Sequence, residues 1–182
     1  MNVIETSLPG VLVLEPRVFR DERGAFFESF NLAKMVELGL PADWKQDNFS
    51  ISKQHVIRGI HYQVGAEAQG KLVRVATGAA LDVIVDLRRN SPTFGQHTMV
   101  ELSGELSRMV WIPVGCGHGF SALTETVGLS YKVTEYYSPK AERTILWNDP
   151  ELGIDWRVTT EEAIVSAKDQ AGVPFVQAEV FA

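Results

Sequence analysis

The sequence predicts a mainly β protein, built as an antiparallel barrel or jelly roll. Short apolar or alternating runs recur along the 182 residues, and turn-forming residues separate them. The clearest run is Ala80–Leu87, where every odd position is Leu or Val and two even positions are Asp82 and Asp86. One face of this strand is therefore expected to be fully apolar and the other mixed.

The other elements follow from similar local signals. Further strands, marked by apolar, β-branched or aromatic residues beside turn residues, are expected at 11–14, 25–30, 109–112 and 127–137. Turns are expected at 21–24 and 91–95. Asn31 can cap a short helix that runs through Leu38 and stops at Gly39. A second helix is expected over Thr159–Ala167.

Composition indicates one globular domain, residues 1–182, with 45% hydrophobic and 22% charged residues. The net charge of −6 and the pI near 5.2, without any basic tract, argue against a nucleic-acid partner. The single cysteine, Cys116, allows neither an internal disulfide nor a multi-cysteine zinc site. No leader-like start or membrane-length apolar run is present, so we expect a cytoplasmic protein without a membrane partner.

The most informative motif is Arg58–Gln63, followed by Lys71–Val75. Arg58 and His61 are three positions apart, so a straight strand would place them on opposite faces, and Gly59 between them can mark a bulge or a close backbone approach. An imidazole among fixed positive charges suits proton transfer on an anionic substrate. The alternative is an ordinary solvated strand face with a structural histidine.

A second motif, Pro113–Phe120, has the Pro-x-Gly-x-x-His spacing of the second motif of cupins, which often supply a metal ligand there. The nearest match to their first motif is His61-Tyr62-Gln63, with Glu67 beyond it. Gln63 replaces one imidazole, and a neutral amide is a poor ligand for a transition metal, so no metal site is predicted. Cys116 in this motif is expected to be a structural thiol, with a nucleophile as the alternative.

The motifs, taken in order, resemble the dTDP-4-dehydrorhamnose 3,5-epimerase family over roughly residues 2–170. The matching runs are 19–24, 46–48, 58–61, 68–74, 91–95, 117–120, 131–132, 147–150 and 166–169. The resemblance implies a cupin-like, double-stranded antiparallel β-barrel with a few short helices, no cofactor and a homodimer. It also implies inversion of C3 and C5 of dTDP-4-dehydro-6-deoxy-D-glucose, giving dTDP-4-dehydro-L-rhamnose in dTDP-L-rhamnose biosynthesis.

The resemblance assigns four catalytic residues. His61 would be the base, Asp169 its partner, Lys71 the group that meets the enolate oxygen, and Tyr131 the acid on the opposite face. Tyr131 and Lys132 should point to opposite sides of a strand, so one of them should face the barrel interior. The implied substrate contacts are Arg23, Glu28, Gln46, Asn48, Arg58, His118, Glu142 and Lys168.

Three departures keep alternatives open. Gly115-Cys116-Gly117-His118 stands where the family often has Gly-Phe-Ala-His, Tyr62 stands where Phe is common, and Arg157 stands where Pro is common. One alternative is an enzyme that epimerises a single carbon, or a ketoisomerase, acting on a related dTDP-deoxysugar. Another is a non-catalytic cupin that only binds a sugar nucleotide, although a binding module needs neither a base nor an opposing acid.

Overall fold

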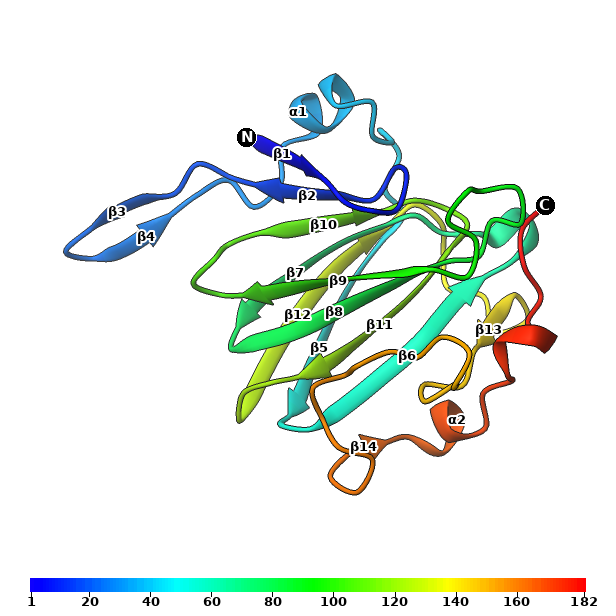
Figure 1. Cartoon of the computed structure of the whole chain (residues 1–182). Helices are drawn as coiled ribbons and strands as arrows, with labels where there is room; N and C mark the ends of the chain where they lie inside the picture. Colours follow the sequence, from blue (N-terminus) through cyan, green and yellow to red (C-terminus); the bar gives the residue numbers. More distant parts are fainter.

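Two antiparallel sheets packed face to face form the body of the molecule, and the computed structural model describes all residues, 1–182 (Figure 1). The strands of the body are β1 Asn2–Glu5, β2 Leu12–Glu15, β5 Gln46–Lys53, β6 Val56–Gln63, β7 Lys71–Thr77, β8 Ala79–Asp86, β9 His97–Ser103, β10 Met109–Ile112, β11 Cys116–Ala122, β12 Thr126–Val133, β13 Glu142–Thr144 and β14 Ile164–Val165. The first sheet has the order β1-β2-β10-β7-β12-β5 and the second β13-β6-β11-β8-β9. The predicted mainly β jelly roll is confirmed.

Apolar side chains fill the space between the sheets and also cover their outer faces. The interior cluster includes Val73, Ile84 and Leu129, which come from both sheets. A second cluster lies under the C-terminal segment, where Leu81 of β8 packs with Trp156. The odd positions of β8 therefore pack outward and the even positions face the interior, so the predicted fully apolar face is the outer one and the mixed face lines the interior.

A two-stranded arm and a short helix precede the body strands. The arm pairs β3 (Phe19–Asp21) with β4 (Gly24–Phe26) and projects away from the sheets (Figure 1). The helix α1 (Leu32–Glu37) confirms the predicted helix: the Asn31 side chain accepts a hydrogen bond from the Lys34 N–H at 3.3 Å. The strand expected at 25–30 is wrong beyond Phe26, because residues 27–30 have no partner strand.

The helix expected at 159–167 is wrong. Residues 159–163 form only a turn, and β14 follows it, pairing in parallel with Val56 and Ile57 of β6. The β-branched residues at 159, 160, 164 and 165 disfavour a helix, and the open side of β6 offers a ladder of hydrogen bonds instead. The short helix α2 (Ala167–Gln170) begins only after Ser166, which caps it.

The remaining elements close the ends of the sandwich. The 3₁₀ turns η1 (Gly65–Glu67) and η2 (Phe175–Gln177) lie in the loop after β6 and in the C-terminal segment. The strand predicted at 127–137 ends at Val133 as β12, and residues 134–138 continue as a loop. Neither helix has the length and apolar character that crossing a membrane requires.

Candidate active site

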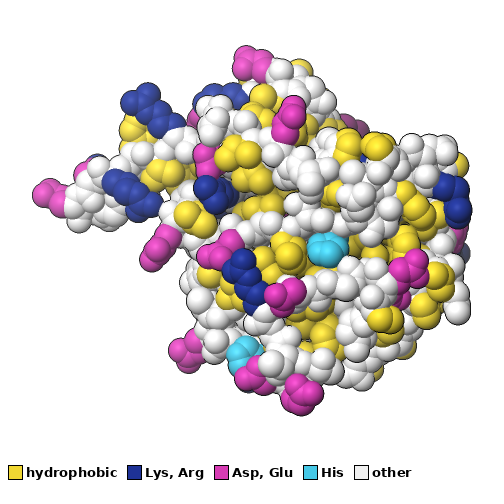
Figure 2. All heavy atoms as spheres, viewed as in Figure 1, with side chains coloured by type: hydrophobic (Ala, Val, Ile, Leu, Met, Phe, Trp, Pro, Cys, Tyr) yellow, Lys and Arg dark blue, Asp and Glu magenta, His cyan; other side chains and the backbone are white.

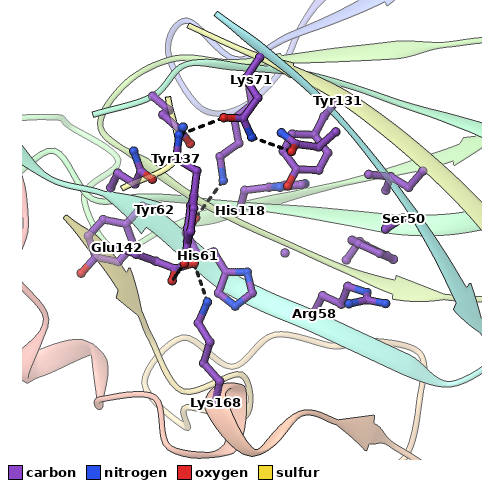
Figure 3. A pocket seen from close by; sticks show the side chains of 17 residues that line it. Ser50, Arg58, His61, Tyr62, Lys71, His118, Tyr131, Tyr137, Glu142 and Lys168 are labelled. Carbon is purple, nitrogen blue, oxygen red and sulfur yellow. Dashed lines mark hydrogen bonds and ion pairs between the residues drawn. The ribbon is translucent and has the colours of Figure 1, made fainter. Parts of the chain in front are cut away.

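A cavity of about 390 Å³ opens between the two sheets (Figure 3). Strands of both sheets, β13 and α2 all contribute side chains to its wall. Its lining residues are Gln46, Asn48, Ser50, Arg58, His61, Tyr62, Gln63, Gln69, Lys71, His118, Gly119, Phe120, Leu129, Tyr131, Tyr137, Glu142 and Lys168. Most of the site residues expected from the sequence therefore share one hollow.

A bulge in β6 lets Arg58 and His61 face this cavity together. In the pairing of β6 with β11, His61 lies opposite His118 and Arg58 lies opposite Phe120, so β6 carries one extra residue. Gly59 has φ +122°, and a Cβ atom there would lie 2.5 Å from the Gly119 Cα. The bulge predicted from the sequence is thus present, and it depends on glycine at position 59.

His61 and Asp169 form a hydrogen-bonded pair at one side of the cavity. The His61 Nε2 lies 2.5 Å from the Asp169 Oδ1, and the Asp169 side chain is nearly fully buried behind the imidazole. Burial alone would raise the pKa of Asp169, but the hydrogen bond and charge of His61 outweigh it, and the pKa lies below its usual value. Asp169 therefore stays ionised and occupies Nε2, which leaves Nδ1 of His61 to take a proton.

Lys71 places an ammonium group in the buried wall of the cavity. Its side chain is almost completely buried, and its Nζ donates to the His61 backbone carbonyl at 3.3 Å. Burial lowers the pKa of Lys71 to about 8, although the negative charges of Asp82 and Glu142 oppose this shift. A positive charge in such a dry position interacts strongly with any negative charge that forms beside it.

Tyr131 enters the cavity from β12, in the sheet opposite to the one that carries His61. Burial raises the pKa of Tyr131 above its ordinary value, and Glu142 adds to the increase. The phenol is therefore protonated at neutral pH. The next residue, Lys132, points to the other side of the sheet and pairs with Asp47 at 2.8 Å, so only one of the two faces the interior, as predicted.

Six of the eight expected substrate contacts line the cavity: Gln46, Asn48, Arg58, His118, Glu142 and Lys168. Lys168 donates to Glu142 at 2.5 Å, and both belong to the side of the cavity that also carries Tyr137 (Figure 3). Arg23 and Glu28 do not line it. Arg23 lies on the projecting arm and binds Asp21 at 2.5 Å, while Glu28 pairs with Lys34 beside α1.

Two residues of the site escaped the sequence reasoning. Asp82 is fully buried, and its Oδ1 lies 2.7 Å from the His118 Nε2. An acidic residue at an interior position of a largely apolar strand was the available signal for it. Tyr137 lines the cavity and donates from its hydroxyl to Glu142 at 2.9 Å. It follows β12 in an irregular loop, so no periodic pattern marks it.

Gln63, at the position where cupins carry a metal-ligating histidine, is engaged in other contacts. The Gln63 side-chain amide donates to the Glu67 and Tyr136 carbonyls and accepts from the Ser138 N–H. No three His, Cys, Asp or Glu side chains are grouped so that they could hold one metal ion. Cys116 is buried outside the cavity lining, and burial raises its pKa to about 12, so it is an unreactive thiol.

Comparisons with known proteins identify the family of this chain. A family model described as dTDP-4-dehydrorhamnose 3,5-epimerase matches residues 5–177. A Salmonella typhimurium dTDP-4-dehydrorhamnose 3,5-epimerase is 53% identical over 172 residues, which cover 94% of this chain and 93% of the relative.

Solved structures show the same similarity. The Legionella pneumophila dTDP-6-deoxy-D-glucose-3,5-epimerase, in complex with dTDP-4-keto-L-rhamnose, has a TM-score of 0.93 at 44% identity, covering 98% of this chain and 94% of that chain. A 3'-monoepimerase from Streptomyces bikiniensis, in complex with dTDP-quinovose, has a TM-score of 0.87 at 31% identity, covering 94% and 86%. This chain belongs to the dTDP-4-dehydrorhamnose 3,5-epimerase family.

Proposed function

We propose that this chain converts dTDP-4-dehydro-6-deoxy-D-glucose to dTDP-4-dehydro-L-rhamnose by inverting C3 and C5. One observation carries the proposal: the His61–Asp169 pair and Tyr131 face one cavity from opposite sheets, with the Lys71 ammonium buried in its wall. Inversion needs a base and an acid on opposite sides of the reacting carbon, and the cavity supplies both. The relatives named for the same reaction support this assignment.

In the first half of the reaction, His61 Nδ1 takes the proton from a carbon next to the C4 ketone. The C–H electron pair becomes the enolate double bond, and negative charge moves to the ketone oxygen. Lys71 stabilises that oxygen, and one such preorganised group lowers a barrier by about 3–4 kcal/mol. Asp169 stabilises the imidazolium that forms.

In the second half, Tyr131 donates its phenolic proton to the other face of the same carbon. The enolate electrons return to form the new C–H bond, the ketone is restored, and the configuration is inverted. Tyr131 is left as a phenolate and His61 as an imidazolium, so proton exchange with solvent resets both. The same steps serve C3 and C5, because both carbons lie next to the ketone.

The cavity also offers groups for the rest of the nucleotide sugar. Arg58, His118 and Lys168 are donors on its wall, and a guanidinium binds diphosphate oxygens in a bidentate fork. Gln46 donates to Asn48 at 2.8 Å, and this amide pair lies on β5 at the same cavity. We assign these residues, together with Glu142, to substrate binding.

We further propose a homodimer in which the arm of one subunit brings Arg23, and the segment that follows the arm brings Glu28, to the site of its partner. The arm stands clear of the body, with charged side chains along it (Figure 2), and it exposes 52% of Phe19 and 70% of Phe26. Large apolar side chains in such a projection favour burial against a second chain. Mixing inactive Arg23→Ala and His61→Asn subunits should restore activity through hybrid dimers, and failure to do so would contradict this arrangement.

Residues 1–182 act as one catalytic domain in this proposal, since the C-terminal Phe175 packs into the same apolar cluster as β6 and β8. The reaction needs no metal or cofactor, because a ketone already makes its neighbouring protons acidic. A cytoplasmic location fits a single buried cysteine without a disulfide. The negative net charge fits a protein without a nucleic-acid partner.

Solvent deuterium incorporation tests the proposed function. The 4-keto sugar nucleotide is incubated with the protein in D₂O, and deuterium is located by NMR. Incorporation at both C3 and C5, with inversion at both, is the expected result. Incorporation at one carbon would instead identify a monofunctional epimerase, and none at either carbon would identify a binding protein.

A further inference from the structure

Three glutamine side chains hold the backbone of the loop after β12, residues 134–138, which we call the rim segment. Gln69 Nε2 donates to the Glu135 carbonyl at 2.6 Å. Gln63 Nε2 donates to the Tyr136 carbonyl at 3.1 Å, and its Oε1 accepts from the Ser138 N–H at 2.8 Å. The third glutamine, Gln46, accepts a hydrogen bond at its Oε1 from the Tyr137 N–H at 3.1 Å.

These glutamines come from different parts of the sandwich. Gln46 begins β5, Gln63 ends β6, and Gln69 precedes β7, so the rim segment is tied to both sheets. Gln63 is the most buried of them, with 4% exposure, and its amide also donates to the Glu67 carbonyl at 2.6 Å. An amide buried with both ends satisfied is costly to replace and defines one conformation of its partners.

The rim segment positions Tyr137 between the cavity and solvent. Tyr137 lines the cavity while 52% of it remains exposed, and its hydroxyl donates to Glu142 at 2.9 Å. Glu142 in turn accepts from Lys168 at 2.5 Å (Figure 3). The glutamine contacts thus hold the backbone that carries Tyr137, and Tyr137 is the first of three hydrogen-bonded side chains on the side of the cavity away from Tyr131 (Figure 3).

We propose that Gln63 is a positioning residue for substrate binding, acting through the rim segment on Tyr137 and Glu142. This proposal rests on the proposed function, since it assigns the ligand of this rim to the nucleotide sugar. Gln63 touches none of the proton-transfer groups through its side chain, and all its polar contacts are to backbone atoms. Its loss should therefore weaken binding and leave the chemical step intact.

Gln63→Met tests this directly, because it keeps the length of the side chain and removes the amide. Amide hydrogen exchange in the ligand-free protein should become about 10-fold faster at Ser138, whose N–H loses its acceptor. KM for the 4-keto sugar nucleotide should rise about 10-fold while kcat stays within about 3-fold of the parent value. Tyr137→Phe should raise KM without changing exchange at Ser138. In the double variant, the fold-increase in KM should be smaller than the product of the two single fold-increases, because both changes act on the same contact.

Gln54→Met is the matched control. Gln54 also donates its amide to a backbone carbonyl, that of Leu123 at 3.0 Å, but it lies outside the cavity lining. This variant should leave KM and rim exchange unchanged. Unchanged exchange at Ser138 in Gln63→Met, or a fall in kcat at constant KM, would overturn the proposal. If the parent protein showed no turnover, the proposed function would fail, and the dissociation constant for dTDP would replace KM in the same comparison.

Discussion

His61 and Tyr131 face the same cavity from opposite sheets of the sandwich. His61 lies on β6 of the second sheet and Tyr131 on β12 of the first, so we expect a sugar ring bound between them to meet the imidazole on one face and the phenol on the other. Asp169 orients the first residue, and burial keeps the second protonated. This relationship makes inversion, rather than simple enolisation, the chemistry that the cavity suits best.

Replacing the base should nearly abolish proton abstraction. General base catalysis contributes about 100- to 10,000-fold, so His61→Asn should lose at least that lower factor in turnover and in deuterium exchange. Binding of dTDP should largely persist, because the phosphate-binding candidates are unchanged. His55→Asn is a suitable control, since His55 lies outside the cavity lining. Near-normal turnover by folded His61→Asn protein would remove His61 from its assigned role.

The buried lysine should give activity and stability opposite responses to alkaline pH. The pKa of Lys71 is about 8 in the folded chain against an ordinary value of 10.5, so kcat should fall above about pH 8 as the ammonium is lost. Between those two values the unfolded chain binds more protons than the folded one. The unfolding free energy contributed by this group should therefore rise with pH across that window, by on the order of 3 kcal/mol.

Lys71→Met is the variant that isolates these effects. It should lose about 100- to 1,000-fold in kcat, as expected for one lost electrostatic stabiliser of the enolate. Its residual pH–rate profile should lack the decline near pH 8, and denaturation curves should lack the corresponding rise in stability. A decline near pH 8 that persists in Lys71→Met would assign that titration to another group.

The bulge at Gly59 should tolerate no side chain. Gly59→Ala adds a Cβ atom 2.5 Å from the Gly119 Cα at a backbone φ of +122°, so strain and overlap should together cost at least about 2 kcal/mol. Gly24→Ala is the matched control: φ there is +125°, but nothing lies within 4 Å. Chemical denaturation should show the larger loss for Gly59→Ala. Equal losses of unfolding free energy in the two variants would show that the close approach of β6 and β11 does not add to the cost of a side chain at position 59.

Cys116 should be dispensable for catalysis. Moving a proton next to a ketone needs no thiol, and Cys116 is buried outside the cavity lining with a raised pKa. Cys116→Ala should retain turnover within a few-fold of the parent protein in a steady-state assay. A covalent adduct trapped on Cys116 during turnover would contradict this expectation.

Much of the fold could be predicted because the signals for many of its strands, helices and bulges lie within a few neighbouring residues. The alternation in Ala80–Leu87, the cap at Asn31 and the glycine in Arg58–Gln63 each act within a few residues, and each has the predicted structure. The helix expected at 159–167 failed because pairing with β6 decided the conformation there. That partner is about a hundred residues away in the sequence, and no window of neighbouring residues contains it.

The site could be predicted only in part from the sequence, because its residues are far apart in the chain. His61 and Asp169 are 108 residues apart, and only folding joins them. Their pairing was expected from the family resemblance and not from any spacing. Tyr137 carries no periodic signal, because hydrogen bonds from its loop to distant glutamines position that loop. In the proposed homodimer the place of the Arg23 arm would depend on a second chain, and no local sequence pattern indicates such a contact.

The most direct measurement is C5 deuterium exchange and epimerisation in Tyr131→Phe, which removes one oxygen and almost no volume. We predict a folded variant in which His61 still exchanges substrate protons with D₂O while epimerised product falls at least about 100-fold, because the intermediate is reprotonated on its original face. Equal loss of exchange and epimerisation would assign Tyr131 a binding or structural role. Undiminished double epimerisation would contradict the central claim that Tyr131 is the acid opposite His61.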